Sequence, residues 1–309
     1  MKASIRGKKV LIVGGTGFIG RHLAERCLKD TPFVTCIGLN VEKSFSKDME
    51  FIRADISDKK QLQAVLSDRL FDYVFNLGGY IDHTAYFKGG RRLIESHFIG
   101  LMNLIDCLNK DNLKGFVQIG SSDEYGNAPA PQKEYMRESL ISPYSFAKTA
   151  ASHFIQTLSN TEGFPGVVLR LFLVYGPGQD EKRFLPQIII AFLKDKPIET
   201  SAGKQLRDFC YIDDVTEGMI RAAVTDKAKG RVINIASGIP VSIKDMTSKV
   251  ADIIGKGRAV FGARPYRQGE NMELFADISI AHDILQWSPS VSVDEGLRKT
   301  IEYYKNKQL

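Results

Sequence analysis

The chain has 309 residues, 43% hydrophobic and 25% charged, which is typical of a globular protein with one large domain or two coupled ones. The net charge is +6 and the pI is about 9.0, but the lysines and arginines are scattered. This distribution argues against a nucleic-acid-binding stripe, while a modest positive charge suits an enzyme with phosphate-bearing substrates and cofactors.

The cysteines and the apolar runs limit the location of the protein. The four cysteines show no paired or CxxC spacing, so we expect neither disulfides nor a zinc site. No apolar run approaches the ~20 residues of a membrane span, and the N-terminal run is too short for a signal peptide. We therefore expect a cytoplasmic protein with no metal and no membrane partner.

The first half of the chain alternates short apolar runs with longer amphipathic segments. The runs that predict strands are 8–15, 33–40, 71–79, 114–122 and 166–176. The segments that predict helices are 19–30, 59–70, 91–111 and 142–160. Such alternation is typical of βαβ units, so the fold class is α/β, with a doubly wound parallel sheet of the Rossmann type.

The pattern changes after residue 175. A loop over 176–183 precedes a predicted helix over 184–196, one more strand follows over 231–237, and the tail from about 240 mixes short helices and loops. We predict a Rossmann dinucleotide-binding domain over 1–175 with a returning segment over about 207–238. Residues 176–206 and 239–309 would form a smaller, mixed α/β substrate lobe.

A glycine-rich turn, "VLIVGGTGFIG", follows the first predicted strand and opens the first predicted helix. Glycines let the backbone approach a pyrophosphate closely, and a helix N-terminus offers N–H groups to it. The alternative, a tight turn without a ligand, fits this strand–turn–helix context less well. The residues predicted to bind the cofactor here are Gly14, Gly17, Phe18, Ile19 and Gly20.

The end of the second strand bears on the cofactor. An acid normally stands there and binds the ribose hydroxyls of NAD, whereas this chain has Asn40 with Lys43 close by. An asparagine still hydrogen-bonds a ribose hydroxyl but does not repel a 2′-phosphate. Both NAD and NADP therefore stay open.

The segment "SPYSFAK" places Tyr144 and Lys148 four residues apart, hence on one face of a helix. A lysine there can lower the pKa of a nearby phenol and make the tyrosine a usable base. An isolated YxxxK is more often a surface tyrosine stacked on a lysine stem, but here it follows a dinucleotide fingerprint and a strand that ends in serines.

With these motifs the sequence resembles the extended short-chain dehydrogenase/reductase family, in particular its nucleotide-sugar epimerases, dehydratases and reductases. The resemblance covers essentially the whole chain. The motifs that carry it are "GGTGFIG" (14–20), "RADISD" (53–58), "SSDEYG" (121–126), "SPYSFAK" (142–148), "RLFLVYGPG" (170–178), "RDFCYIDDV" (207–215) and "RQGENMELFADISIAHDILQWSP" (267–289).

The resemblance implies roles for individual residues. Tyr144 would be the general acid/base at a sugar carbon, commonly C4, and Ser121 would polarise the same oxygen. Lys148 would tune the tyrosine and bind the nicotinamide ribose, and Asp55 and Ile56 would lie at the adenine.

Further positions follow from the same resemblance. Leu77 and Gly78 would contact the cofactor, and Ser122 the substrate. Arg207 and Arg267 match the two arginines that bind the substrate pyrophosphate, where a guanidinium fork suits a diphosphate.

The stretch "FVQIGSSDEYG" (116–126) allows two alignments with the dehydratases, which have two acids here. An ungapped count from Tyr125 places Ser121 on the catalytic hydroxyl, Asp123 on the base and Glu124 on a position that is usually apolar. A gap before Tyr125 would instead match Asp123 and Glu124 to both dehydratase acids. We prefer the ungapped count because it keeps the strand in register. Asp123 is then a single auxiliary acid/base and Glu124 a bystander.

Several positions depart from the family pattern. The usual His-Leu-Ala-Ala after the third core strand is "NLGG" over 76–79, and the usual asparagine of the long helix is His97. A histidine there is most often a satisfied structural residue. Leu173 replaces an asparagine that often touches the substrate, so the resemblance does not identify the sugar.

Together these features predict a nucleotide-sugar oxidoreductase that transfers a hydride between NAD(P) and a carbon, most often C4, of a nucleoside-diphosphate hexose. We favour a 4-epimerase; the alternatives are a reductase of a 4-keto-6-deoxy sugar, then a 4,6-dehydratase, and remotely a non-catalytic dinucleotide-binding regulator. The resemblance also implies a homodimer through helices at 91–110 and 143–160.

Overall fold

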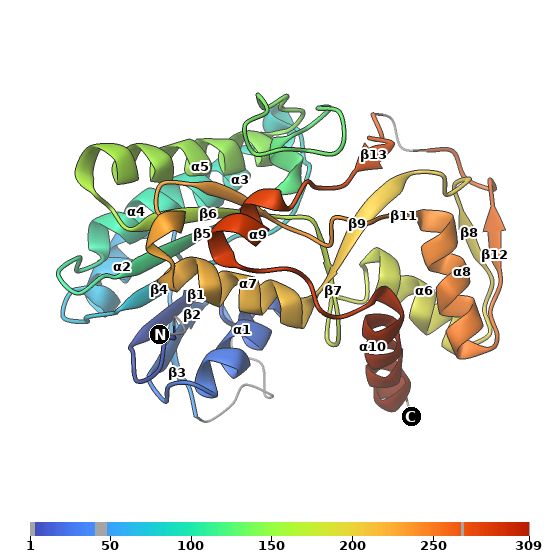
Figure 1. Ribbon diagram of the computed structural model, residues 1–309, viewed down its shortest axis with the longest axis horizontal. Helices are drawn as coiled ribbons and strands as arrows, with labels where there is room; N and C mark the ends of the chain where they lie inside the picture. Colours follow the sequence, from blue (N-terminus) through green and yellow to red (C-terminus); the bar gives the residue numbers. More distant parts are fainter. Residues whose placement is uncertain (1–3, 41–47, 267–268, 309) are drawn as a thin grey trace.

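The computed structural model describes residues 4–40, 48–266 and 269–308, and it centres on a seven-stranded sheet whose strands all run parallel (Figure 1). The strand order is β10-β6-β5-β4-β1-β2-β3. The chain therefore reverses its direction of winding between β1 and β4, which is where open α/β sheets bind ligands. The strands are β1 (Val10–Val13), β2 (Val34–Gly38), β3 (Glu50–Arg53), β4 (Tyr73–Asn76), β5 (Gly115–Ser121), β6 (Gly166–Leu171) and β10 (Val232–Ile235).

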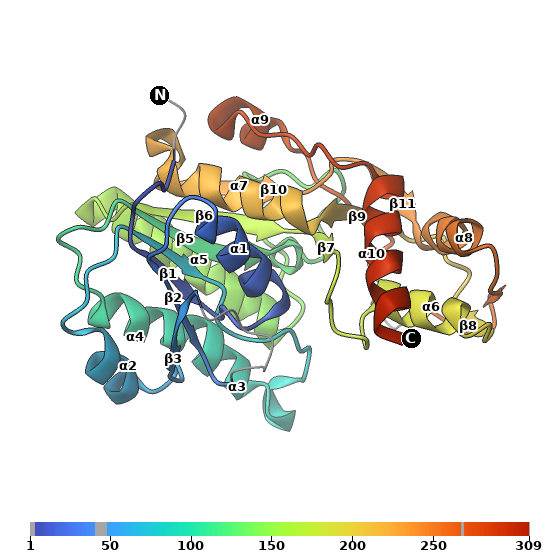
Figure 2. The ribbon, with the colours of Figure 1, turned by 90° about the horizontal axis from the view of Figure 1, so that it is seen from below.

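Helices cover both faces of this sheet, which explains why its strands are nearly continuous apolar runs (Figure 2). One face packs against α2 (Lys59–Leu66), α4 (Gly100–Cys107) and α5 (Pro143–Glu162). The other packs against α1 (Phe18–Leu28), α7 (Ile212–Val224) and α9 (Ser279–Leu285). The predicted α/β fold class with its doubly wound parallel sheet is confirmed.

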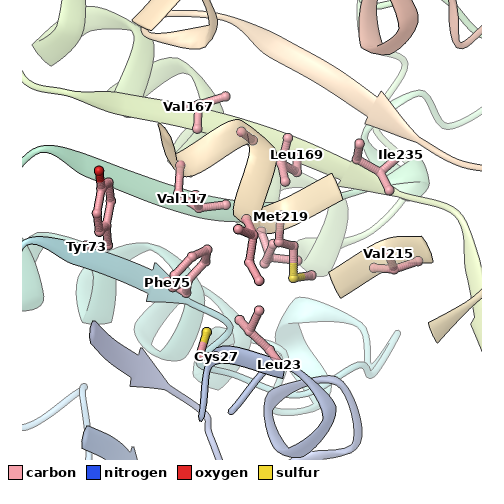
Figure 3. Close-up of a cluster of buried hydrophobic side chains, with 14 of the residues drawn as sticks. Leu23, Cys27, Tyr73, Phe75, Val117, Val167, Leu169, Val215, Met219 and Ile235 are labelled. Carbon is pink, nitrogen blue, oxygen red and sulfur yellow. The ribbon is translucent and has the colours of Figure 1, made fainter. Parts of the chain in front are cut away.

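Figure 3 shows the core under α1 and α7. Leu23 and Met219 extend from the two helices toward Phe75, Val117 and Leu169 on neighbouring strands, and all five side chains are fully buried. Complete burial of side chains of this size contributes about 1.5–3 kcal/mol each. This core holds the strand ends, and thus the loops that follow them, in fixed positions.

The long helix predicted over 91–111 is interrupted in the structure. It consists of α3 (Arg91–Ile94), a π-helical turn η2 (Glu95–Ile99) and α4. A π-helical turn inserts one residue into the helical spacing and often marks a functional site. The apolar pattern gave no sign of it, because a helical face continues on either side.

A second group of elements lies to the right in Figure 1 and has a core of its own. Its four-stranded sheet contains β7 (Leu173–Tyr175), β9 (Leu206–Tyr211), β11 (Pro240–Ser242) and β13 (Glu273–Leu274), and β8 (Ile198–Thr200) pairs with β12 (Ala259–Phe261). Its helices are α6 (Phe184–Leu193), α8 (Ile243–Ile254) and α10 (Val293–Gln308).

The division into two domains stays a proposal. Within the segment 207–238, α7 and β10 belong to the layers of the large sheet, whereas β9 belongs to the second sheet. The remaining short turns are η1 (Tyr86–Lys88), η3 (Ser122–Glu124) and η4 (Asp226–Ala228). Among the residues that the structure describes, no helix is long and apolar enough to span a membrane.

Candidate functional site

A cleft of about 790 Å³ opens at the carboxyl ends of β1, β2, β3 and β4. This is the crevice where the winding of the sheet reverses. Seven of the residues predicted to bind the cofactor line it. They are Gly14, Gly17, Asn40, Asp55, Ile56, Leu77 and Gly78.

The glycine-rich turn forms the floor of this cleft. A Cβ atom at Gly20 would lie 2.2 Å from the carbonyl oxygen of Gly14, so only glycine allows α1 to pack this closely on the turn. The N-cap of α1 is Gly17, whose lack of a side chain leaves the N–H groups of the first turn open. Phe18 contacts His22 edge-on and Ile19 packs against the core, so their side chains serve packing.

The rim of the cleft carries the predicted ribose and adenine residues. Asn40 is exposed directly after β2. The Asp55 carboxylate accepts hydrogen bonds from the backbone N and the hydroxyl of Ser57 at 2.9 and 2.7 Å, and the Ile56 side chain is buried. The glycine turn, the open helix start and this rim fit the pyrophosphate and ribose of a dinucleotide.

Ser121, Tyr144 and Lys148 come together at the end of β5. Helix α5 starts with Ser142 as N-cap and Pro143 at N1, and Tyr144 and Lys148 lie on its buried face. The Lys148 ammonium lies 5.9 Å from the centroid of the Tyr144 ring, and Ser121 is within hydrogen-bonding reach of the phenol. The spacing in the sequence thus places a phenol, a hydroxyl and an ammonium side by side.

The electrostatics of this group differ from the expectation. Burial, followed by the negative charge of Asp123, raises the pKa of Tyr144, and the hydrogen bond with Ser121 opposes the rise only in part. Burial also lowers the pKa of Lys148 to about 8, against the attraction of nearby carboxylates. In this state Lys148 therefore does not bring the pKa of the phenol down toward neutral pH, because desolvation of the tyrosinate is the largest effect on that pKa.

Asp123 lies in η3 beside this group. Burial raises its pKa, and the charge of His83 opposes that rise. The distance from Asp123 Oδ2 to His83 Nε2 is 3.7 Å. Its backbone N–H donates to the Ser121 hydroxyl at 3.1 Å, and Ser122, which begins the same turn, is buried.

Glu124 is not a bystander to the fold, although it does not face the cleft. Its side chain is completely buried and accepts hydrogen bonds from the backbone N of Ser121 (2.8 Å), the hydroxyl of Ser152 (2.7 Å) and Nε of Arg170 (2.9 Å). Arg170 also pairs with Glu138 at 2.7 Å. Glu124 thus connects the catalytic end of β5 to α5 and β6, as the ungapped alignment implies for an inward-facing position.

The structure describes one of the two arginines predicted to bind the substrate pyrophosphate. Arg207 in β9 is buried, forms an ion pair with Glu270 and donates to the carbonyl oxygen of Leu206 at 2.7 Å. Burial lowers its pKa, and Glu270 opposes that shift. Arg267 lies outside the described residues. Leu173, which replaces the substrate-touching asparagine, pairs with Phe209 between β7 and β9.

His97, in the π-helical turn, packs against Tyr144 with ring centroids 5.1 Å apart. Its Nε2 lies 2.8 Å from the carbonyl oxygen of Tyr80, so Nε2 carries the proton, and the buried Nδ1 has no hydrogen-bond partner. Burial lowers its pKa to about 3, so the ring is neutral. A Cβ atom at Gly79 would lie 2.1 Å from His97 Cε1, so the histidine requires the glycine of "NLGG". Gly79 and His97, which both depart from the family pattern, therefore depend on each other.

Two residues at the site, His83 and Arg183, were not predicted from the sequence. His83, in the loop after β4, approaches the Tyr144 ring edge-on at 5.8 Å. Arg183, the N-cap of α6, contributes positive charge that lowers the pKa of Tyr144. Both belong to irregular segments without periodicity. The signal that could have revealed His83 is its place just beyond the carboxyl end of a core strand.

Comparisons with known proteins give a consistent result. The model of the NAD dependent epimerase/dehydratase family matches residues 10–236. A UDP-glucuronate 4-epimerase of Thermodesulfobacterium geofontis is 28% identical over 96% of this chain and 95% of its own. The structure of a UDP-glucuronic acid 4-epimerase from Bacillus cereus, in complex with UDP-glucuronic acid and NAD, is 30% identical, with a TM-score of 0.86 and coverage of 97% and 99%. A UDP-glucose 4-epimerase from Thermotoga maritima, with UDP-glucose, is 25% identical, with a TM-score of 0.91 and coverage of 97% and 100%.

Proposed function

This chain belongs to the NAD dependent epimerase/dehydratase family, and from that premise we propose that it is a 4-epimerase of a nucleoside-diphosphate hexose that uses NAD. The choice of an epimerase over a dehydratase rests on the two adjacent acids, Asp123 and Glu124. Asp123 lies beside Tyr144, whereas Glu124 is buried in an ion pair with Arg170. A 4,6-dehydratase must also move protons at C5 and C6, for which a second free acid in this stretch would serve. The similar proteins point to UDP-sugars as the first substrates to test.

In this proposal each side chain has a task. Tyr144 takes the proton of the C4 hydroxyl while the Ser121 hydroxyl donates to the same oxygen, and Tyr144 returns the proton once the configuration has changed. Lys148 donates to the carbonyl oxygen of Ile119 at 2.8 Å, which fixes its ammonium beneath the tyrosine. NAD bound along Gly14, Gly17 and the rim of the cleft would supply the nicotinamide that accepts the hydride from C4 of the sugar, and its positive charge would favour the tyrosinate form of Tyr144.

NAD rather than NADP is supported by the Bacillus cereus neighbour, which holds NAD. Asn40 lines the cleft and is uncharged, so it does not itself repel a 2′-phosphate. We expect NAD to raise the melting temperature of the purified protein more than an equal concentration of NADP, since stabilisation by a ligand grows with the ratio of its concentration to its dissociation constant. Equal or greater stabilisation by NADP would overturn this choice.

The reaction is tested by incubating the purified protein with UDP-glucose, UDP-glucuronate or UDP-N-acetylglucosamine and following the sugar by proton NMR. We expect a mixture of C4 epimers, reached from either side, without net consumption of nicotinamide. Stoichiometric consumption of NADPH with a 4-keto sugar would indicate a reductase instead. A 4-keto-6-deoxy product would indicate a dehydratase, and bound NAD without turnover of any sugar a regulator.

The role of Tyr144 is tested by Tyr144→Phe. Loss of the general acid/base is expected to lower kcat about 10²–10⁴-fold. Calorimetry should still detect binding of the nucleotide sugar, because the ring remains. Tyr135→Phe, at a tyrosine that is 78% exposed, is the control and should leave turnover unchanged. Full activity of Tyr144→Phe would refute the assigned role.

We also propose a homodimer formed by α5 and the helical segment from α3 to α4. Ile99 and Phe146 expose 39% and 47% of their surface on these helices, although both are large apolar residues. Pairing of two copies would cover them. Sedimentation equilibrium should give the mass of two chains, and a monomer mass at micromolar concentration would contradict the proposal.

A further inference from the structure

His83 lies in the loop between β4 and η1, beside Asp123 and Tyr144, where the proposed function places the sugar. The loop is held by the Asp82 carboxylate, which accepts hydrogen bonds from the backbone N and the hydroxyl of Thr84 at 2.9 and 2.8 Å. This turn encloses His83 and fixes its backbone. The side chain is 57% exposed, so a ligand can reach it.

The imidazole has two neighbours on different elements. Its Nε2 is 3.7 Å from Oδ2 of Asp123 in η3, and its ring meets the ring of Tyr144 in α5 edge-on at 5.8 Å. A histidine, a carboxylate and the proposed general acid/base therefore form one cluster. The ring of His97, which also packs against Tyr144, is neutral, so it cannot balance the charge of Asp123.

The charges in the cluster are linked. The charge of Asp123 raises the pKa of Tyr144, and among the charges acting on Asp123 that of His83 has the largest effect. The other charged groups facing Asp123 are Glu124, Arg207 and Lys148, while Asp82 faces His83 from its own loop. Arg207 is already paired with Glu270 and Lys148 donates to a backbone carbonyl, and His83 is the most exposed of these counter-charges.

We propose that His83 is a positioning residue of the sugar site: it pairs with Asp123 and directs that carboxylate toward a hydroxyl group next to the carbon on which Tyr144 acts. This inference rests on the proposed function for the identity of the ligand, but the pairing itself is a property of the resting protein. A solvated surface pair would contribute almost nothing. Here the Asp123 carboxylate is only 29% exposed, and the charge of His83 opposes the rise of its pKa that burial causes, so loss of His83 raises that pKa further.

The kinetic test uses His83→Gln with His153→Gln as its matched control. His153 also pairs with a carboxylate, at 3.4 Å from Glu138, and its side chain is 59% exposed, but it lies outside the cluster. We expect kcat/KM of His83→Gln to fall about tenfold, because Asp123 loses a counter-charge 3.7 Å away, and the acid limb of its pH profile to move to higher pH. His153→Gln should stay within about twofold of the wild type.

A double-mutant cycle then shows whether His83 acts through Asp123. Asp123→Asn should abolish the acid limb, and adding His83→Gln to Asp123→Asn should cause no further loss. If the losses of the two single variants instead multiply in the double variant, His83 acts independently of Asp123 and the proposal is wrong.

A second readout needs no turnover and separates this inference from the proposed reaction. Carboxyl-carbon NMR of protein with ¹³C-labelled aspartate, assigned with Asp123→Asn, reports the titration of Asp123 directly. We expect His83→Gln to raise the pKa of Asp123, since burial then acts with less opposition. An unchanged titration overturns the pairing. A raised pKa in a protein that turns over no UDP-sugar supports the pairing and refutes only the proposed reaction.

Discussion

The cleft at the ends of β1 to β4 and the group around Tyr144 are built from different kinds of residue; the proposed function makes them the cofactor half and the sugar half of the site. The cofactor half is lined mainly by glycines and by uncharged residues at the ends of neighbouring strands, together with Asp55, Arg92 and Glu95. The sugar half consists of titratable side chains from separate elements: His83 from a loop, Asp123 from η3 and Tyr144 from α5.

This difference shows which parts of such a site tolerate change. A backbone cradle depends on conformation, so it is retained wherever glycine is retained. A group of side chains depends on the charge and burial of each partner, so a new residue at one position alters the pKa values of its neighbours. The departures from the family pattern that the structure explains lie next to the group around Tyr144: His97 packs against Tyr144, Gly79 leaves room for His97, and Glu124 accepts a hydrogen bond from the backbone N of Ser121.

The largest expected effect tests the charge network beneath the sugar half. Glu124→Ala leaves Arg170 buried with one partner fewer, and we expect a loss of about 3–5 kcal/mol in the free energy of unfolding. Urea denaturation measures it. Asp106→Ala, which breaks the exposed Lys59–Asp106 pair, should cost less than about 1 kcal/mol. Similar losses in the two variants would show that burial does not distinguish the pairs.

A prediction of intermediate size concerns the stability of the protein and the pKa of Lys148, which lies beneath Tyr144. Because the pKa of Lys148 is about 8 in the folded protein and 10.5 normally, the unfolded chain binds more protons between these values. The lowered pKa of Lys148 therefore reduces the free energy of unfolding of the wild type by its full amount below pH 8. This reduction disappears as the pH rises toward 10.5. Stability of Lys148→Met relative to the wild type should be about 2–3 kcal/mol more favourable at pH 7 than at pH 10. A gap that is independent of pH would contradict the lowered pKa.

The smallest effect tests the backbone cradle. Gly20→Ala brings a methyl group against the carbonyl of Gly14, and we expect a loss of about 1–3 kcal/mol in stability together with weaker binding of NAD. Gly17→Ala is the matched control for stability, because its φ is −73° and its nearest contact would be 3.3 Å. It should cost under about 1 kcal/mol. Equal stability losses would mean that the packing of α1 does not require glycine at position 20.

The sequence predicted the parallel sheet and the cofactor turn because their signals are local: apolar runs alternate with amphipathic helices, and the glycines are close together. It also placed Tyr144 and Lys148 on one helical face, since that spacing is a local property. It did not predict the π-helical turn at His97, the burial of Glu124 against Arg170, or the approach of His83 to Asp123. Each depends on contacts between distant segments.

The direction of the Tyr144 pKa shift could not be predicted for the same reason. The sequence shows that a lysine lies near the phenol, but not how completely both are removed from water. Burial decides the balance between desolvation and charge, and it is a property of the assembled molecule.

The contact between Gly79 and His97 couples the substitutions that the two positions can accept. With the backbone and the ring as they stand, a methyl group at position 79 would lie 2.1 Å from His97 Cε1, and φ of Gly79 is +108°, a conformation that side chains disfavour. A side chain at position 79 therefore requires both a change of backbone and a move or loss of the histidine ring. Variation at one of these positions is thus constrained by the residue at the other.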